Sequence, residues 1–126
     1  MAKKDDRPID VGLAALIGSD EASVTAFWKK RFELIGAIPS EIARVGAMTP
    51  QLRELTRITN ETERERLTRT RIIAFAQLPA DVRQKIAEAR KAAWKVDQEV
   101  LQKDQTLVEK ILPMVDASVR SAYPSP

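Results

Sequence analysis

The residues best placed to bind a charged ligand are two arginines, Arg64 and Arg71, which stand seven residues apart. That spacing puts both side chains on one side of a helix. Two guanidinium groups on one side could hold phosphate or another small anion. We favour a structural alternative for Arg71, in which the stem covers the core while the guanidinium pairs with a glutamate on a neighbouring helix. The same helix side carries three apolar residues, Leu67, Phe75 and Leu78.

Catalysis by the commonest residue sets would need side chains that the chain lacks. It contains no histidine and no cysteine, which excludes Ser-His-Asp and Cys-His sets and any metal site built from imidazole or thiolate. The four glycines stand singly, so there is no glycine-rich phosphate loop. A magnesium or calcium site made of carboxylates stays open, although no EF-hand spacing occurs. We therefore expect no enzymatic activity, no cofactor, and no catalytic, cofactor-binding or metal-binding residue.

Nucleic acid is an alternative partner, because the segment 64–71 holds four arginines. The net charge is only +3, from 21 basic and 18 acidic residues, and the two signs are interspersed along the chain. Nucleic-acid-binding proteins usually gather positive charge on one face. Three glutamates just before and within the same segment would repel phosphate. We therefore rank this alternative below a protein–protein interaction role. A second basic cluster, which we interpret as a solvated helix face, comprises Lys29, Lys30 and Arg31.

The clearest pattern in the chain lies between Pro79 and Pro113, where no glycine or proline occurs. Small and aliphatic residues recur there at alternating steps of four and three, which predicts one helix over about 80–112 with a narrow, coiled-coil-like seam. Such a helix is about 50 Å long, whereas a compact globule of this chain length is about 35 Å across. We therefore expect an elongated bundle, or a helix that pairs with another copy. The seam consists of Val82, Ile86, Ala89, Ala93, Val96 and Val100.

Lys103 and Asp104 interrupt the apolar stripe further along this helix. A polar layer in a helical seam can fix register or partner number at a cost in stability. The simpler interpretation, which we favour, is that the helix leaves the bundle at this point and its polar residues face water.

The rest of the chain predicts shorter helices. One begins near Pro8 and Asp10 and ends at Gly18, and a second is capped by Ser19 or Asp20 and ends at Gly36. A third starts near Pro39 and stops at Gly46. A fourth starts at the pair Thr49-Pro50. It either runs on to Leu78 or breaks near Thr59-Asn60, and we favour the break because Asn60 and Glu63 fit a capping box. A last short helix reaches about Tyr123, and we expect tails at 1–7 and 124–126.

The segment 72–76 is apolar on every side, which places it inside the fold or in an interface between copies. Together these patterns predict a single all-α domain over 1–126, an elongated helical bundle of five or six helices with one long C-terminal helix. No run of apolar residues is long enough to span a bilayer, and we expect a cytoplasmic location. The expected role is protein–protein interaction or assembly, as a homo-oligomer or with another helical protein. The candidate interface residues are Ile72, Ile73, Phe75, Val82, Ile86, Ala89, Ala93, Val96 and Val100.

Overall fold

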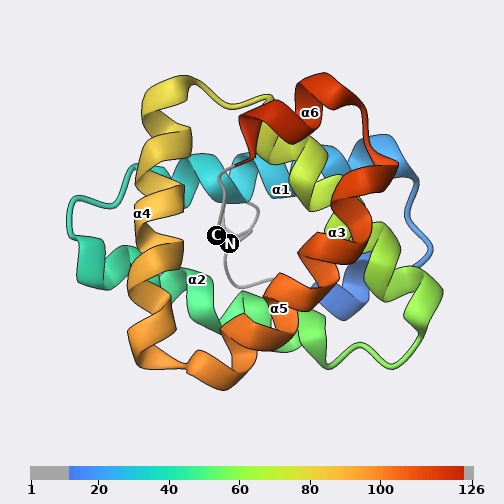
Figure 1. Ribbon diagram of the computed structural model, residues 1–126, viewed down its shortest axis with the longest axis horizontal. Helices are drawn as coiled ribbons and strands as arrows, with labels where there is room; N and C mark the ends of the chain where they lie inside the picture. Colours follow the sequence, from blue (N-terminus) through green and yellow to red (C-terminus); the bar gives the residue numbers. More distant parts are fainter. Residues whose placement is uncertain (1–11, 124–126) are drawn as a thin grey trace, which may run out of the picture.

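The computed structural model describes residues 12–123 of the chain, and this part is built from helices without any strand (Figure 1). The described residues form six α-helices and two short 3₁₀ segments, so the expectation of an all-α fold with five or six helices is confirmed. The expected tails 1–7 and 124–126, and the expected first helix start at Pro8, lie outside the described residues. In chain order the elements are η3 (Leu13–Leu16), α1 (Glu21–Gly36), α2 (Glu41–Thr56), α3 (Glu61–Ala76), α4 (Ala80–Val96), α5 (Gln98–Ile111), η4 (Leu112–Met114) and α6 (Ala117–Ala122).

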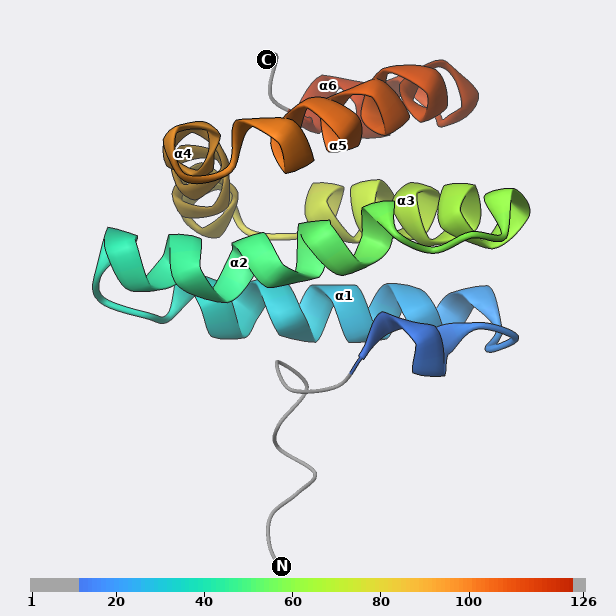
Figure 2. The ribbon, with the colours of Figure 1, turned by 90° about the horizontal axis from the view of Figure 1, so that it is seen from below.

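The helices pack in an order that differs from the order along the chain. α1 packs mainly against α3, while α2 packs against α4 and α5. α4 crosses the others at one end of the molecule, where Figure 2 shows it almost end-on. α5 and α6 then pack on α3 from the side opposite α1 (Figure 2). Helices α1 to α5 thus surround a common interior.

Two helix starts follow from local capping and match the prediction. The Asp20 carboxylate accepts the Ser23 N–H at 2.7 Å and so begins α1. The Asn60 side-chain oxygen accepts the Glu63 N–H at 2.9 Å and begins α3. Both side chains satisfy amide groups that the first helical turn leaves without partners. The predicted break between two helices near Thr59-Asn60 is therefore confirmed.

The helix start predicted at Thr49-Pro50 and the stop predicted at Gly46 are both wrong, because α2 runs through them. Pro50 has no N–H to donate to the Gly46 carbonyl, which removes one helical hydrogen bond. The Thr49 hydroxyl donates to the Val45 carbonyl at 2.8 Å and supports the turn just before the proline. Buried residues on both sides of this point, including Val45 and Leu52, hold the two halves of α2 on the same core.

The single long helix predicted over 80–112 is also wrong. The chain leaves helical geometry at Asp97, whose φ is −149° and ψ is 80°. One carboxylate oxygen of Asp97 accepts the Val100 N–H at 3.2 Å, and the other accepts from Arg53 on α2 at 2.8 Å. Asp97 thus caps α5 and anchors the corner between α4 and α5 (Figure 1). Because the chain turns here, α4 and α5 are two shorter helices, and no helix longer than a compact globule is present in the described residues to require an elongated bundle.

The core is organised around aromatic side chains from α1 and α3. Trp28 stacks on Phe32, whose ring meets the edge of Phe75 with centroids 5.9 Å apart. Phe75 in turn packs on Tyr123, with centroids 5.3 Å apart. The apolar segment 72–76 contributes Ile72, which is fully buried, and Phe75. It therefore passes through the middle of the fold, as one of the two sequence interpretations predicted.

Candidate functional site

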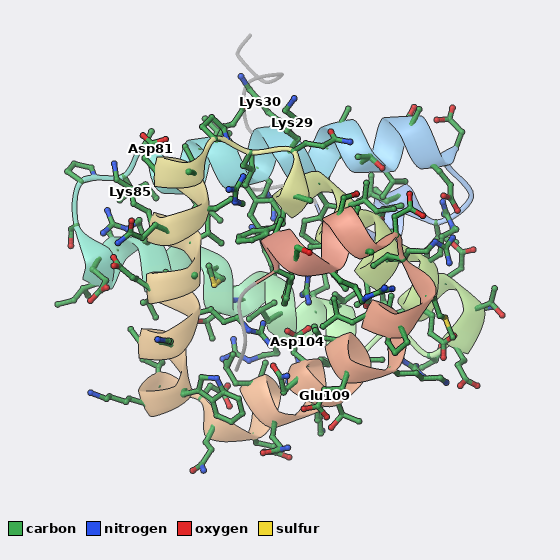
Figure 3. The ribbon with its side chains drawn as sticks, turned by 45° about the horizontal axis from the view of Figure 1, so that its top comes forward. Lys29, Lys30, Asp81, Lys85, Asp104 and Glu109 are labelled. Carbon is green, nitrogen blue, oxygen red and sulfur yellow. The ribbon has the colours of Figure 1, made fainter. Side chains whose placement is uncertain are left out.

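The most strongly polar feature of the interior is an ion cluster that joins three helices. Arg71 on α3 donates from both terminal nitrogens to the two carboxylate oxygens of Asp104 on α5, at 2.9 and 3.1 Å. Arg90 on α4 donates to the same carboxylate, and to the Gln105 side-chain oxygen at 3.0 Å. Asp104 lies on the inner side of α5, whereas Glu109 lies on its outer side (Figure 3). We call Arg71, Asp104 and Arg90 the ion cluster.

The charges in the ion cluster stabilise one another. Burial raises the pKa of the Asp104 carboxyl, but Arg71 and Arg90 lower it by more, so the net pKa lies below its ordinary value. Burial lowers the pKa of Arg71, while Asp104 and the Tyr123 hydroxyl raise it by more, so the guanidinium remains charged. Two positive charges thus share one carboxylate, and the cluster keeps one unit of positive charge.

The favoured sequence interpretation of Asp104, a residue facing water, is therefore wrong. Its side chain is fully buried, while the adjacent Lys103 is exposed. The sequence held a signal for this placement. Leu101, Asp104, Val108 and Ile111 follow one another at steps of three, four and three, so the apolar stripe passes through Asp104. The partners of Asp104 stand 33 and 14 residues earlier in the chain, and no local pattern links them to it.

The structure separates the two arginines proposed as an anion contact. Arg71 lies in the ion cluster, paired with an aspartate rather than with the expected glutamate. Arg64 donates to the Ile58 carbonyl at 2.6 Å, at the junction between α2 and α3. Arg64 therefore fixes a loop, and the two guanidinium groups do not share an acceptor.

The other two arginines of the segment 64–71 also have protein partners. Arg66 pairs with Glu63 at 2.8 Å and donates to the Ser19 carbonyl at 2.8 Å. Arg69 pairs with Glu21 on α1 at 2.5 Å. These contacts hold α3 against the start of α1 and reduce the positive charge available to a phosphate backbone, so the geometry does not favour the nucleic-acid alternative.

The second basic cluster is only partly a solvated face. Lys30 is exposed and Lys29 is half-buried (Figure 3), but Arg31 is fully buried. The Arg31 guanidinium carbon lies 4.7 Å from the centroid of the Phe27 ring, a cation–π contact within one turn of α1. The interpretation of Arg31 as a solvated residue is wrong, because its side chain folds over this ring.

The candidate interface residues divide by burial. Five of them are buried in the chain's own core: Ile72 and Phe75 on α3, and Ile86, Ala89 and Ala93 on the side of α4 that packs against α1 and α2. They are not available to a partner in this fold. Three others, Ile73, Val82 and Val100, are half-buried. Val96 alone of the set is largely exposed, at 66%.

Val96 borders an apolar groove between the first turns of α2 and the last turns of α4, of about 420 Å³. Ile42, at the start of α2, is 86% exposed beside it. In the sequence, Ile42 falls within the short helix predicted between Pro39 and Gly46, and no pattern there points to a contact surface. The groove beside Ile42 forms because α4 packs against α2, a contact between helices that no local sequence pattern predicts. We call this feature the α2–α4 groove, and it is lined by Glu41, Ile42, Val45, Gly46, Ala92, Lys95 and Val96.

Within residues 12–123, no group of three or more acidic residues is arranged to hold a metal ion. No helix in this range is long and apolar enough to cross a bilayer. Comparison with protein-family models, with curated proteins and with solved structures found no match to this chain.

Proposed function

We propose that this chain is a non-catalytic assembly protein that forms a reversible homodimer through the α2–α4 groove. The observation that carries the proposal is the exposure of two large aliphatic side chains, Ile42 at 86% and Val96 at 66%, on the two sides of one groove. Single exposed aliphatic residues are common on protein surfaces, but clustered ones that border a concave apolar surface are typical of interaction sites.

Small residues at the groove let a second backbone approach closely. A Cβ atom added at Gly46 would have no neighbouring atom within 4 Å, so this part of α2 presents bare backbone. Ala92 is the facing small residue on α4. Because Pro50 cannot donate to the Gly46 carbonyl, that oxygen lacks its usual helical partner. A helix laid in the groove would cover the aliphatic side chains and pack against α2 at short range.

The charges at the rim favour a second copy of the chain as the occupant. One acidic residue, Glu41 on α2, and one basic residue, Lys95 on α4, border the groove. In a two-fold symmetric dimer the same patch meets itself in reverse orientation. Each Glu41 can then face Lys95 of the second copy, and both charged pairs form at once. A groove of this kind complements itself without any further partner.

The size of the groove indicates weak pairing. A stable complex buries roughly 800 Å² on each partner, and two aliphatic side chains with a few small neighbours supply only part of such an area. Rim charges add mainly orientation and association rate. We therefore expect monomers at low concentration and dimers at high concentration.

Sedimentation velocity over a concentration series, from roughly 10 µM to 1 mM, tests this proposal. The wild-type chain should shift from monomer to dimer across the series. Ile42→Glu should remain monomeric, because it places a charge in the groove without disturbing the core. Met114→Glu is the matched control, since Met114 is 61% exposed and lies outside the groove. Monomeric wild type throughout, or equal effects of the two variants, would reject the proposal.

A further inference from the structure

A small cavity, partly open to the surface beside Ala87 and Arg90, lies between α1, α2, α3 and α4, with Tyr123 at one side. Its volume is about 30 Å³. A single water molecule requires roughly 10–15 Å³ measured in this way, so the cavity has room for about two groups the size of water. Most of its wall is apolar and comes from the aromatic and aliphatic core.

Two polar side chains in the cavity wall have hydrogen-bond donors without acceptors. Trp28 on α1 is 1% exposed and Gln51 on α2 is 7% exposed. Within the part of the chain that the structure describes, neither the Trp28 Nε1–H nor the Gln51 Nε2 amide has a hydrogen-bond partner. A buried donor without an acceptor costs about 1–3 kcal/mol. Two such donors in the wall of one cavity indicate that the cavity takes up a group with acceptor atoms.

The electrostatic surroundings favour an acceptor that is negatively charged. Arg71 and Arg90 both line the cavity, and both donate to the single carboxylate of Asp104, which leaves one unit of positive charge. Among residues 12–123, no aspartate or glutamate lines the cavity. Because the interior has a lower effective dielectric constant than water, this excess charge attracts an anion more strongly than it would at the surface.

We propose that the cavity is a binding site for a small monovalent anion of about the size of formate. Its oxygen atoms accept the Trp28 and Gln51 N–H groups, and its charge balances the excess charge of the ion cluster. Anions the size of phosphate or sulfate exceed the space. The site lies in the interior, away from the α2–α4 groove, so the proposal does not depend on the proposed dimer.

The Trp28 indole N–H is a direct probe of this site in the intact chain. In a chloride-free buffer, sodium formate is titrated into ¹⁵N-labelled protein while the two indole resonances are followed, with sulfate at matched ionic strength as the reference. The resonance of Trp94, assigned with Trp94→Phe, is an internal control because Trp94 does not line the cavity. We expect a saturable shift of the Trp28 indole with formate alone. No shift, or a linear drift shared with Trp94, would mean that the cavity takes water only. The same shift with sulfate would mean that the effect is not specific to a small monovalent anion. Each of these results would overturn the proposal.

Two substitutions at Gln51 complete the test. Gln51→Leu removes one donor and should weaken formate binding about tenfold. Gln51→Glu supplies the cavity with a carboxylate of its own and should abolish the formate-dependent shift. The second variant keeps the test intact if the first fails to fold. A formate titration unchanged in Gln51→Glu would overturn the proposal. The added carboxylate should fill the same space as formate and supply the same negative charge.

Discussion

Arg71 and Asp104 form a two-pronged ion pair, at 2.9 and 3.1 Å, in which both side chains are removed from water. The pair joins α3 to α5, and Arg90 adds α4 to the same carboxylate. A buried ion pair contributes little net stability compared with apolar packing, but the loss of one partner leaves a charge buried without compensation. The ion cluster therefore makes the arrangement of three helices depend on one residue.

Asp104→Asn should lower the free energy of unfolding by about 3–5 kcal/mol. The amide keeps the shape of the carboxylate but leaves Arg71 and Arg90 buried without a counter-charge. Urea denaturation followed by circular dichroism measures the change. Glu99→Gln, on the same helix with its side chain 80% exposed, is the control and should alter stability by about 0.5 kcal/mol or less. Equal midpoints for the two variants would show that the ion cluster does not hold the fold together.

The same carboxylate should make stability depend on pH in the acid range. Its folded-state pKa lies below the ordinary value of 3.8 to which it returns on unfolding. The stabilisation is therefore fully present above pH 3.8 and is lost as the pH falls through the lower, folded-state pKa. The difference in unfolding free energy between wild type and Asp104→Asn should shrink as the pH falls from about 6 to about 2.5.

Other carboxylates with lowered pKa values contribute equally to both proteins and cancel in that difference. If the difference in unfolding free energy between wild type and Asp104→Asn stayed constant over this pH range, the acid-sensitive stabilisation would not come from the Asp104 carboxylate. The carboxylates that cancel are Asp20, Glu61, Glu63 and Asp97.

Asp97→Ala should destabilise the fold more than Asp81→Ala does. Asp97 caps α5 and pairs with Arg53 on α2, so its loss removes a local and a long-range contact together. Asp81 lies exposed in the first turn of α4 and accepts no capping hydrogen bond there. Urea midpoints provide the comparison. In the Asp97→Ala background, Arg53→Gln should have almost no further effect, and a full additional loss would mean that the two side chains act separately.

Substitution of glycine by alanine should change the free energy of unfolding in opposite directions at Gly46 and at Gly36. Gly46→Ala should raise the free energy of unfolding by about 0.5–1 kcal/mol, because the new methyl group meets open space and alanine favours a helix. Gly36→Ala should lower it, since the new Cβ would lie 3.0 Å from Val82 Cγ1 where α1 meets α4. Adding Val82→Ala to Gly36→Ala should recover part of the loss. Destabilisation by Gly46→Ala would contradict the open surface described at the groove.

Helix starts were predictable from the sequence where capping is local. Asp20 and Asn60 each accept an amide three residues later, and that relation is visible in the chain itself. The buried side of α1 was predictable for the same reason, since the spacing of Val24, Trp28 and Phe32 follows the helical period.

Helix continuity was not predictable, because it depends on contacts between distant residues. Pro50 stands inside α2 because buried residues before and after it pack on one core. Asp97 ends α4 with no glycine or proline nearby, because Arg53 on another helix holds its carboxylate. An aspartate followed by Gln98 and Glu99 does resemble a helix start, so a weak local signal was present.

The candidate site likewise combines residues that local sequence patterns identify with partners that only the packing of distant helices supplies. The sequence identified Arg71 at an apolar edge and Val96 in the seam, but the partners of both come from other helices. Asp104 binds Arg71 across 33 residues, and Ile42 lies beside Val96 because α4 packs against α2. The lining of the cavity, with Trp28 and Gln51, likewise needs four helices in place.

The measurement that most directly tests the proposed assembly uses two variants with opposite rim charges, Glu41→Lys and Lys95→Glu. In a two-fold dimer, each variant alone sets like charges against each other at both rims, so each should stay monomeric by sedimentation velocity. Mixed in equal amounts, they restore both attractive pairs between unlike copies and should form a heterodimer. Monomers in the mixture, or dimers of either variant alone, would contradict pairing through the α2–α4 groove.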